Sequence, residues 1–189
     1  MSVTLADLEK KYWESADPWR FRTSPYEQEK FAATRMALAQ NCYVSAVELG
    51  CGNGALAEYL APLCANYVGI DRVERAVIAA RQAVPEARFI QRLFPCTLPA
   101  GDHDLIVLSE ILYFLDETDI AALAEQISQS WPRAEIICVT YLGETGHVLQ
   151  GEEAFRAFTR ALGAAFKFRN LETTPGYRID RHVWQEQIR

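Results

Sequence analysis

The chain has no long apolar run and no excess of positive charge. No stretch approaches the roughly 20 apolar residues of a membrane-spanning helix, and the opening MSVTLADLEKKYW has no basic segment followed by an apolar one. Binding to a phosphate backbone relies on basic patches, yet Lys and Arg number 19 against 25 Asp and Glu. We therefore expect a cytoplasmic protein that acts on a small molecule and binds neither membranes nor nucleic acids.

Cysteine and histidine occur without the spacing of a metal site. The five cysteines include no CxxC pair and no Cys/His grouping, so the sequence predicts neither a metal site nor a disulfide framework. Two of the three histidines, His103 and His182, are interpreted as structural or surface residues. Reduced and mostly buried thiols are expected at Cys42, Cys51, Cys64, Cys96 and Cys138.

Length and composition predict one globular domain. The 189 residues suffice for one sizeable core, half of them are hydrophobic, and the sequence has no internal repeat or low-complexity segment. Within this single domain we place an N-terminal helical lid at residues 1–42 and a cofactor-binding core at residues 43–189.

Apolar periodicity in the core alternates between the strand and the helix pattern. The runs SAVELGC and NYVGID are short and rich in β-branched residues, and the leucines between them recur at helical spacing, which predicts a βαβ unit. Further strands are expected at ARFIQ, HDLIVLS and EIICVTY, followed by a hairpin about Thr174-Pro175-Gly176. The alternation favours a parallel sheet with helices between its strands.

The N-terminal segment predicts two helices joined by an aromatic and charged stretch. Ser24, Pro25 and Glu27 form a capping-box pattern, so the second helix should begin at Pro25 and extend to about Gln40. The preceding stretch, WESADPWRFRT, suits neither helix nor strand. We expect the whole segment of residues 1–40, this stretch included, to cover the acceptor side of a binding cleft. The alternative is that its aromatic residues only close the core. Candidate acceptor-binding residues are Trp19, Phe21, Arg22 and Tyr26.

A glycine cluster follows the first predicted strand in VELGCGNG, at Gly50, Gly52 and Gly54. A turn of this kind lets the backbone approach a ligand, and Asp71 at the end of the second strand can accept hydrogen bonds from ribose hydroxyls. The glycines also fit the dinucleotide-binding pattern if Ala55 takes the third position. Glu48 argues against a dinucleotide, because its carboxylate would repel a pyrophosphate. The same carboxylate would tolerate the ammonium group of a cofactor that contains methionine.

These motifs resemble those of class I S-adenosylmethionine-dependent methyltransferases: VELGCGNG, the acidic end of GID, and HDLIVLSEILYFL. The resemblance implies a Rossmann-like α/β fold, with a seven-stranded, mostly parallel sheet, helices on both faces and an antiparallel last strand. DPWRFRTSPYEQEKFAAT followed by LSEILYFL is similar to the nodulation protein S family. Members of that family N-methylate a deacetylated chitooligosaccharide.

The resemblance implies a set of cofactor-binding residues. The loop around the methionine half would comprise Glu48, Gly50, Cys51, Gly52 and Gly54, with Ser109 beside the sulfonium. Asp71 would bind the ribose hydroxyls, and Arg72 would lie along the adenine. Many relatives carry an acidic residue after the third strand, whereas this chain has QRLFP there, so backbone groups at Arg92 and Leu93 would replace it.

On the acceptor side the resemblance points to the residues that follow the fourth and fifth strands. Glu110 is the leading candidate, with Tyr113 beside it, and His147 could also orient an amine or take its proton. The alternatives are that Glu110 only caps a turn or pairs with an arginine, and that His147 is a solvated loop residue.

The sequence therefore predicts methyl transfer from S-adenosylmethionine to a small acceptor, leaving S-adenosylhomocysteine. The sharpest version of this prediction is N-methylation of an amino sugar. O-methylation of another metabolite, cofactor binding without catalysis and a nicotinamide oxidoreductase are the alternatives.

Overall fold

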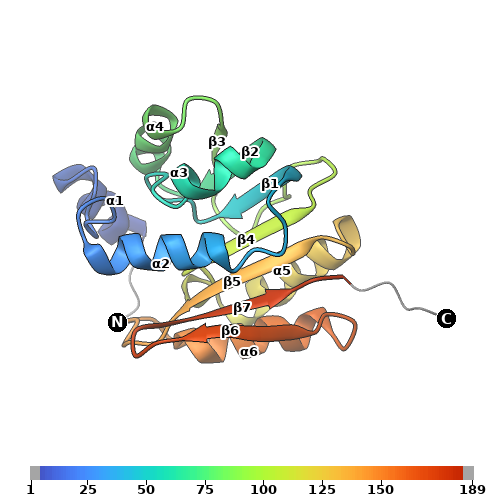
Figure 1. Cartoon of the computed structure of the whole chain (residues 1–189). Helices are drawn as coiled ribbons and strands as arrows, with labels where there is room; N and C mark the ends of the chain where they lie inside the picture. Colours follow the sequence, from blue (N-terminus) through green and yellow to red (C-terminus); the bar gives the residue numbers. More distant parts are fainter. Residues whose placement is uncertain (1–4, 185–189) are drawn as a thin grey trace.

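The computed structural model describes residues 5–184, which form a seven-stranded sheet in the order β3-β2-β1-β4-β5-β7-β6 (Figure 1). All neighbouring strands from β3 to β5 are parallel, and β7 runs antiparallel to both β5 and β6. The predicted fold class is thus confirmed, including the antiparallel last strand. The strands are β1 (Tyr43–Leu49), β2 (Cys64–Asp71), β3 (Arg88–Gln91), β4 (Leu105–Ser109), β5 (Glu135–Tyr141), β6 (Phe168–Thr173) and β7 (Tyr177–His182).

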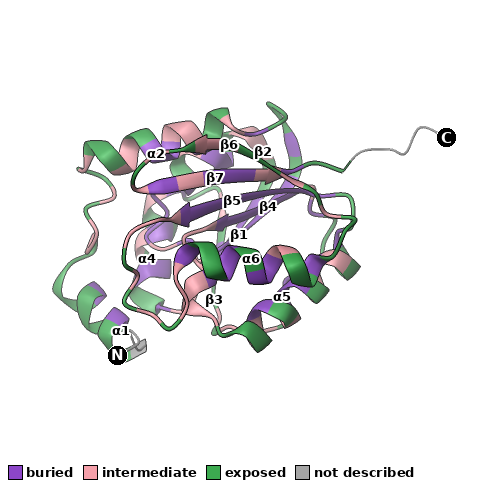
Figure 2. Ribbon diagram, turned by 90° about the horizontal axis from the view of Figure 1, so that it is seen from below, coloured by how far each residue is buried: buried purple, intermediate pink, exposed green. Residues whose placement is uncertain are grey.

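Helices cover both faces of the sheet. One core layer packs α2 (Pro25–Met36), α3 (Ala57–Leu60) and α4 (Glu74–Ala83) on one face, and the other packs α5 (Glu117–Ser130) and α6 (Gly151–Leu162) on the opposite face. Figure 2 shows the central strands buried along most of their length, while α5 and α6 expose their outer sides. This arrangement explains why Leu105–Leu108 of β4 are all apolar, because a strand covered on both faces needs apolar side chains in both directions.

The N-terminal segment forms the two expected helices. α1 (Leu5–Glu14) packs beside α4, whereas α2 lies across the sheet and against α3 (Figure 1). Asp17 organises the loop between them, since its two carboxylate oxygens accept the backbone N–H groups of Phe21 and Arg22 at 2.8 and 2.9 Å. The aromatic and charged loop is therefore ordered by its own polar groups.

Several local predictions were wrong. The second lid helix ends at Met36, four residues before the expected Gln40. Neither half of the capping box forms: Ser24 makes no side-chain cap, its N–H donates to the Arg20 carbonyl at 2.8 Å, and the Glu27 carboxylate pairs with Lys30. The helix after β1 is also short, because Pro62 lacks an N–H group and the chain passes into a 3₁₀ turn over Ala61–Leu63.

The five cysteines differ in burial, whereas His103 and His182 are both buried. All five cysteines are free, but only Cys51 and Cys138 are buried, so the expectation of mostly buried thiols was wrong: Cys64 and Cys96 are half-buried and Cys42 is exposed. His103 and His182 are both buried, and burial lowers the pKa of each ring. Each makes a polar contact, with Ser45 Oγ at 2.8 Å and the Lys167 carbonyl at 3.0 Å respectively.

The sheet reverses its winding between β1 and β4. β2 and β3 extend the sheet on one side of β1, and β4 and β5 extend it on the other, so the carboxyl ends of β1 and β4 stand side by side. Ligands of doubly wound proteins bind at such a switch point. Within residues 5–184, no helix is long and apolar enough to cross a bilayer.

Candidate active site

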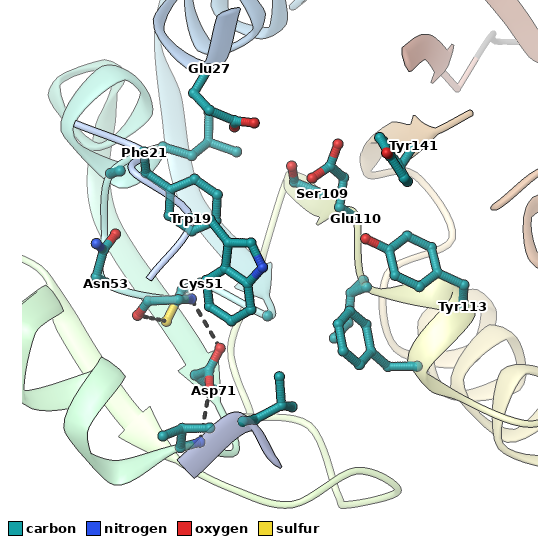
Figure 3. A pocket seen from close by; sticks show the side chains of 18 of the residues that line it. Trp19, Phe21, Glu27, Cys51, Asn53, Asp71, Ser109, Glu110, Tyr113 and Tyr141 are labelled. Atoms are coloured by element: carbon teal, nitrogen blue, oxygen red, sulfur yellow. Dashed lines mark hydrogen bonds between the residues drawn. The ribbon is translucent and has the colours of Figure 1, made fainter. Parts of the chain in front are cut away.

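A cavity of about 470 Å³ opens at this switch point, between the lid helices and the carboxyl ends of the strands. Figure 3 shows Cys51, Asn53 and Asp71 on one side of it and Ser109, Glu110, Tyr113 and Tyr141 on the other. Of the residues predicted to bind cofactor or acceptor, the lining includes Trp19, Phe21, Tyr26, Glu48, Gly50, Cys51, Gly52, Asp71, Arg72, Ser109, Glu110, Tyr113 and His147.

The three glycines of the loop all have positive φ, at +77°, +52° and +79°, but they face different neighbours. A Cβ atom on Gly50 would lie 2.8 Å from Ile111 Cδ1, and one on Gly52 would lie 3.2 Å from the Tyr12 hydroxyl. On Gly54 it would lie 2.9 Å from the Ala80 Cα of α4, so this glycine permits helix packing and does not line the cavity.

The backbone donors of the glycine loop are already used. The N–H groups of Gly50 and Cys51 donate to the Ile70 carbonyl at 2.8 and 3.0 Å, and that of Gly54 donates to Cys51 at 3.0 Å. The N–H of Gly52 donates to Asp71 Oδ2 at 2.9 Å. These four N–H groups are therefore satisfied within the protein and are not free to bind a phosphate.

Asp71 joins the glycine loop to the start of α4. Its other oxygen, Oδ1, accepts the Val73 N–H at 2.8 Å. Burial raises the pKa of the Asp71 carboxyl, and these backbone donors partly oppose the rise. Each carboxylate oxygen retains a lone pair, so the group can still accept hydrogen bonds from a diol such as ribose.

Glu48 is a buried carboxyl at the base of the cavity. The Tyr67 hydroxyl donates to its Oε2 at 2.8 Å. Burial raises the pKa of Glu48 to about 7, with the Tyr67 hydrogen bond opposing the rise and the charge of Asp71 adding to it. Because an ionised Glu48 lacks a cationic partner among the described residues, a ligand ammonium would complete the site.

The lid divides between the two halves of the cavity. The Tyr12 ring of α1 stands over the glycine loop and stacks edge-on against Trp19, which in turn stacks on Phe21 at 5.6 Å. α2 instead brings Tyr26, Glu27 and Lys30 toward the end of β4. The expectation that the whole segment covers the acceptor side was too simple, since α1 covers the glycine loop.

Three other predicted residues lie outside the cavity lining. Arg22 is turned toward α3, where it pairs with Glu58 and donates to the Asn53 carbonyl at 3.1 Å. The prediction for Arg92 and Leu93 concerned their backbone groups. The Arg92 N–H donates to the Asp71 carbonyl at 2.9 Å, its guanidinium donates to the Thr97 carbonyl, and Leu93 is exposed. Arg22 is held away from the cavity by Glu58 and the Asn53 carbonyl.

Glu110 projects from the end of β4 with an unusual backbone. Its φ is +53°, which costs a non-glycine residue about 1 kcal/mol or more, and its N–H donates to the Val139 carbonyl at 2.8 Å. The side chain pairs with Lys30 Nζ at 2.8 Å, and Lys30 also contacts Glu27 at 2.8 Å. Glu110 thus pairs with a lysine of the lid, where the sequence had suggested an arginine as the alternative partner.

Aromatic rings surround this ion-paired cluster. Tyr26 packs edge-on against Tyr177 of the terminal hairpin, and its hydroxyl would lie 2.5 Å from a Cβ atom on Gly176, so the hairpin fixes the ring. Tyr113 and Tyr141 lie beside Glu110 (Figure 3). The His147 and Phe114 ring centroids lie 4.4 Å apart, and burial together with the charge of Arg72 lowers the pKa of His147.

The charge of the lining is negative. Five carboxylates face three basic side chains, with Lys11, Lys30 and Arg72 as the basic members. Asn53 Oδ1 and Arg72 Nε are buried without a hydrogen-bond partner within the described part of the chain. The cavity therefore fits a polar ligand that carries positive charge. The described residues contain no group of three or more His, Cys, Asp or Glu side chains that could hold a metal ion.

The sequence did not reveal Tyr12, Glu27, Lys30, Asn53 and Tyr141 as lining residues. Tyr12 and Lys30 carried a weak signal, because each falls on the buried side of its helix although a hydroxyl or an ammonium group favours contact with water. Their partners are distant in sequence, so only the tertiary fold identifies the role.

The sheet order, the antiparallel β7, the glycine loop after β1 and the carboxylate that ends β2 together define a class I S-adenosylmethionine-dependent methyltransferase fold and cofactor site. The family model of Nodulation protein S (NodS) matches residues 3–138. The chain belongs to this family, which confirms both levels of the predicted resemblance.

Comparisons with individual proteins support the same family assignment. The chain is 33% identical over 139 residues to nodulation protein S of Sinorhizobium fredii, covering 71% of this chain and 60% of that protein. It is 31% identical to nodulation protein S of Bradyrhizobium diazoefficiens, covering 77% and 75%. The N-methyltransferase NodS of Bradyrhizobium japonicum WM9, solved with S-adenosyl-L-homocysteine, superimposes with a TM-score of 0.83 at 24% identity, covering 98% of this chain and all of that one.

Proposed function

We propose that this protein transfers a methyl group from S-adenosylmethionine to the amine of a small acceptor, with an amino sugar as the acceptor class. The observation that carries the proposal is the pair of carboxylates, Glu27 and Glu110, which face the cavity opposite the glycine loop. A cationic amine is the acceptor that these charges attract, whereas a carboxylic acid would be repelled. The N-methyltransferase described for NodS supports the same assignment.

The reaction asks the chain to bind, orient and deprotonate. The cofactor, when bound, supplies an activated methyl group, so that a carbon–nitrogen bond forms as its carbon–sulfur bond breaks. Asp71 is proposed to hold the ribose hydroxyls and Glu48 the ammonium group of the methionine. Glu110 is proposed to receive the proton that the acceptor ammonium must lose before its nitrogen can attack.

The surroundings of Glu110 suit a sugar that carries an amine. Tyr26, Tyr113 and Tyr141 offer flat rings for the apolar face of a pyranose and hydroxyls for its oxygens. The lid helix α2 leaves only 12% and 20% of the Glu27 and Glu110 side chains exposed, so an amine bound beside them would be largely desolvated. We place this reaction in the cytoplasm, where the five cysteines stay reduced.

The proposal is tested with S-adenosylmethionine labelled in its methyl group. A fully deacetylated chitooligosaccharide should gain label on nitrogen, and the fully acetylated oligosaccharide should gain none. Label on oxygen would make the protein an O-methyltransferase, and binding of S-adenosylhomocysteine without transfer to any acceptor would make it a binding protein. NADH should not bind in calorimetry, because Glu48 and the occupied loop N–H groups disfavour a pyrophosphate.

Affinity for S-adenosylhomocysteine should rise about tenfold between pH 6 and pH 8, because Glu48, with its pKa of about 7, must ionise to pair with the ligand ammonium. The folding stability of the ligand-free protein should depend on pH in the opposite direction. Burial favours the protonated form of Glu48, so the contribution of Glu48 to stability is present at low pH and is lost as the pH rises through 7. Calorimetry at three pH values measures the first effect.

The matched variant is Tyr67→Phe, which removes the hydrogen bond that lowers the Glu48 pKa. The rise in affinity should then move to higher pH. A pH-independent affinity in the unaltered protein would remove Glu48 from the cofactor site.

A further inference from the structure

Lys30 is a fully buried lysine, with 1% of its surface exposed. Lysine is almost never buried to this extent unless its charge is paired. Here the ammonium is paired twice, with Glu27 Oε2 and Glu110 Oε1 each 2.8 Å from Nζ. It also lies 5.4 Å from the centroid of the Tyr26 ring.

The lysine stands behind its two partners as seen from the cavity. The side chains of Glu27 and Glu110 are 12% and 20% exposed, against 2% for Lys30. Glu27 lies one helical turn before Lys30 on α2, and Glu110 directly follows β4 on the facing wall. Both carboxylates are labelled in Figure 3, where they flank the upper part of the cavity. The ligand-facing charges are therefore the carboxylates.

A purely structural role accounts poorly for this arrangement. Burying a cation costs solvation energy that its ion pairs only partly return, and well-packed apolar residues often stabilise a protein as well or better. An apolar side chain at position 30 would anchor α2 to the sheet without that cost. What it could not do is neutralise one of two neighbouring carboxylates.

We propose that Lys30 is a positioning residue of the acceptor site: it holds Glu27 and Glu110 side by side as ion-paired carboxylates and leaves the three residues with one net negative charge. That charge matches one acceptor ammonium. The proposal rests on the function proposed above and adds Glu27 to the groups that recognise the amine.

Several other groups act on Glu27. Its own element contributes Tyr26 and Lys30, β4 contributes Glu110, and the lid loop contributes Asp17. Burial raises the pKa of the Glu27 carboxyl, and Lys30 is the largest influence in the opposite direction. Loss of the Lys30 charge should therefore raise the pKa of Glu27 further.

The experiment uses four variants of the full chain: Lys30→Met, Lys30→Arg, Glu27→Gln, and the double variant Lys30→Met/Glu27→Gln. The double variant is the decisive one, because a double-mutant cycle shows whether Lys30 acts through Glu27. Lys10→Met, at a lysine whose side chain is 75% exposed, is the matched control. Affinity for S-adenosylhomocysteine should stay within about twofold throughout, which reports that each variant folds.

The first measurement needs no acceptor. Carboxyl carbons labelled in glutamate are titrated by NMR with S-adenosylhomocysteine bound, and the Glu27 signal is assigned by its loss in Glu27→Gln. Lys30→Met should move the Glu27 midpoint upward by about one pH unit or more, whereas Lys30→Arg and Lys10→Met should not. An unmoved midpoint in Lys30→Met would overturn the proposal.

The second measurement separates KM from kcat with the deacetylated chitooligosaccharide. Lys30→Met and Glu27→Gln should each raise KM about tenfold or more, and the double variant should be no worse than the more impaired single variant, whereas a structural anchor would make the two losses multiply. If the unaltered protein methylates no amine, the proposed function fails, and the Glu27 titration alone decides the role of Lys30.

Discussion

Glu110→Gln should lower kcat by about 100-fold or more while S-adenosylhomocysteine binds within about twofold of its normal affinity. Glutamine preserves the size of the side chain and can still accept a hydrogen bond from Lys30, so the wall of the cavity should persist. It cannot receive a proton from an ammonium, and it removes the charge closest to the proposed acceptor. The loss should therefore appear in turnover more than in cofactor binding.

Single-turnover methylation of the deacetylated chitooligosaccharide measures this effect directly. Glu86→Gln, which makes the same chemical change at an exposed residue outside the cavity lining, is the matched control. If the Glu110 variant keeps the normal rate and only KM rises, Glu110 binds the acceptor without taking its proton. A normal rate and a normal KM would remove Glu110 from the site.

Glu110 could be predicted from the sequence, because it follows an apolar strand of a doubly wound fold and such positions face the ligand. Lys30 could not. Its spacing on α2 only assigns it to a helix, and the contact with Glu110 joins residues 80 positions apart. Whether a lysine on a lid helix faces solvent or a carboxylate depends on how the helix docks, which local sequence does not encode.

The correct fold predictions likewise rest on patterns set by the sheet itself, and the wrong ones concern side chains whose partners the pattern does not show. Strands β4 and β5 were predicted because their residues are apolar on both faces, a pattern set by the sheet itself. The expected capping box at Ser24 is absent, since the Ser24 N–H donates to the Arg20 carbonyl and the Glu27 carboxylate pairs with Lys30 of the same helix. Arg22 was drawn from the cavity by Glu58, a partner 36 positions away that local sequence does not indicate.

Deleting residues 1–22 should reduce methyl transfer by about 100-fold or more and should also weaken S-adenosylhomocysteine binding by about tenfold. The first effect follows from exposing the acceptor amine and Glu110 to water. The second follows from loss of Tyr12 and Trp19, since the Tyr12 ring closes over Gly52 and supports Trp19 edge-on at 5.4 Å. Both halves of the cavity lose a wall.

A truncated protein can fail for lack of stability, so a matched pair of point variants separates the lid function from folding. Trp19 lines the cavity, whereas Trp13 is 71% exposed and stacks on Arg75 outside it. Trp19→Ala should impair both turnover and cofactor affinity, and Trp13→Ala should impair neither, with thermal unfolding recorded for each. Equal activity of the two variants, together with a truncated protein that folds and methylates at the normal rate, would show that the N-terminal segment serves only to cover the core.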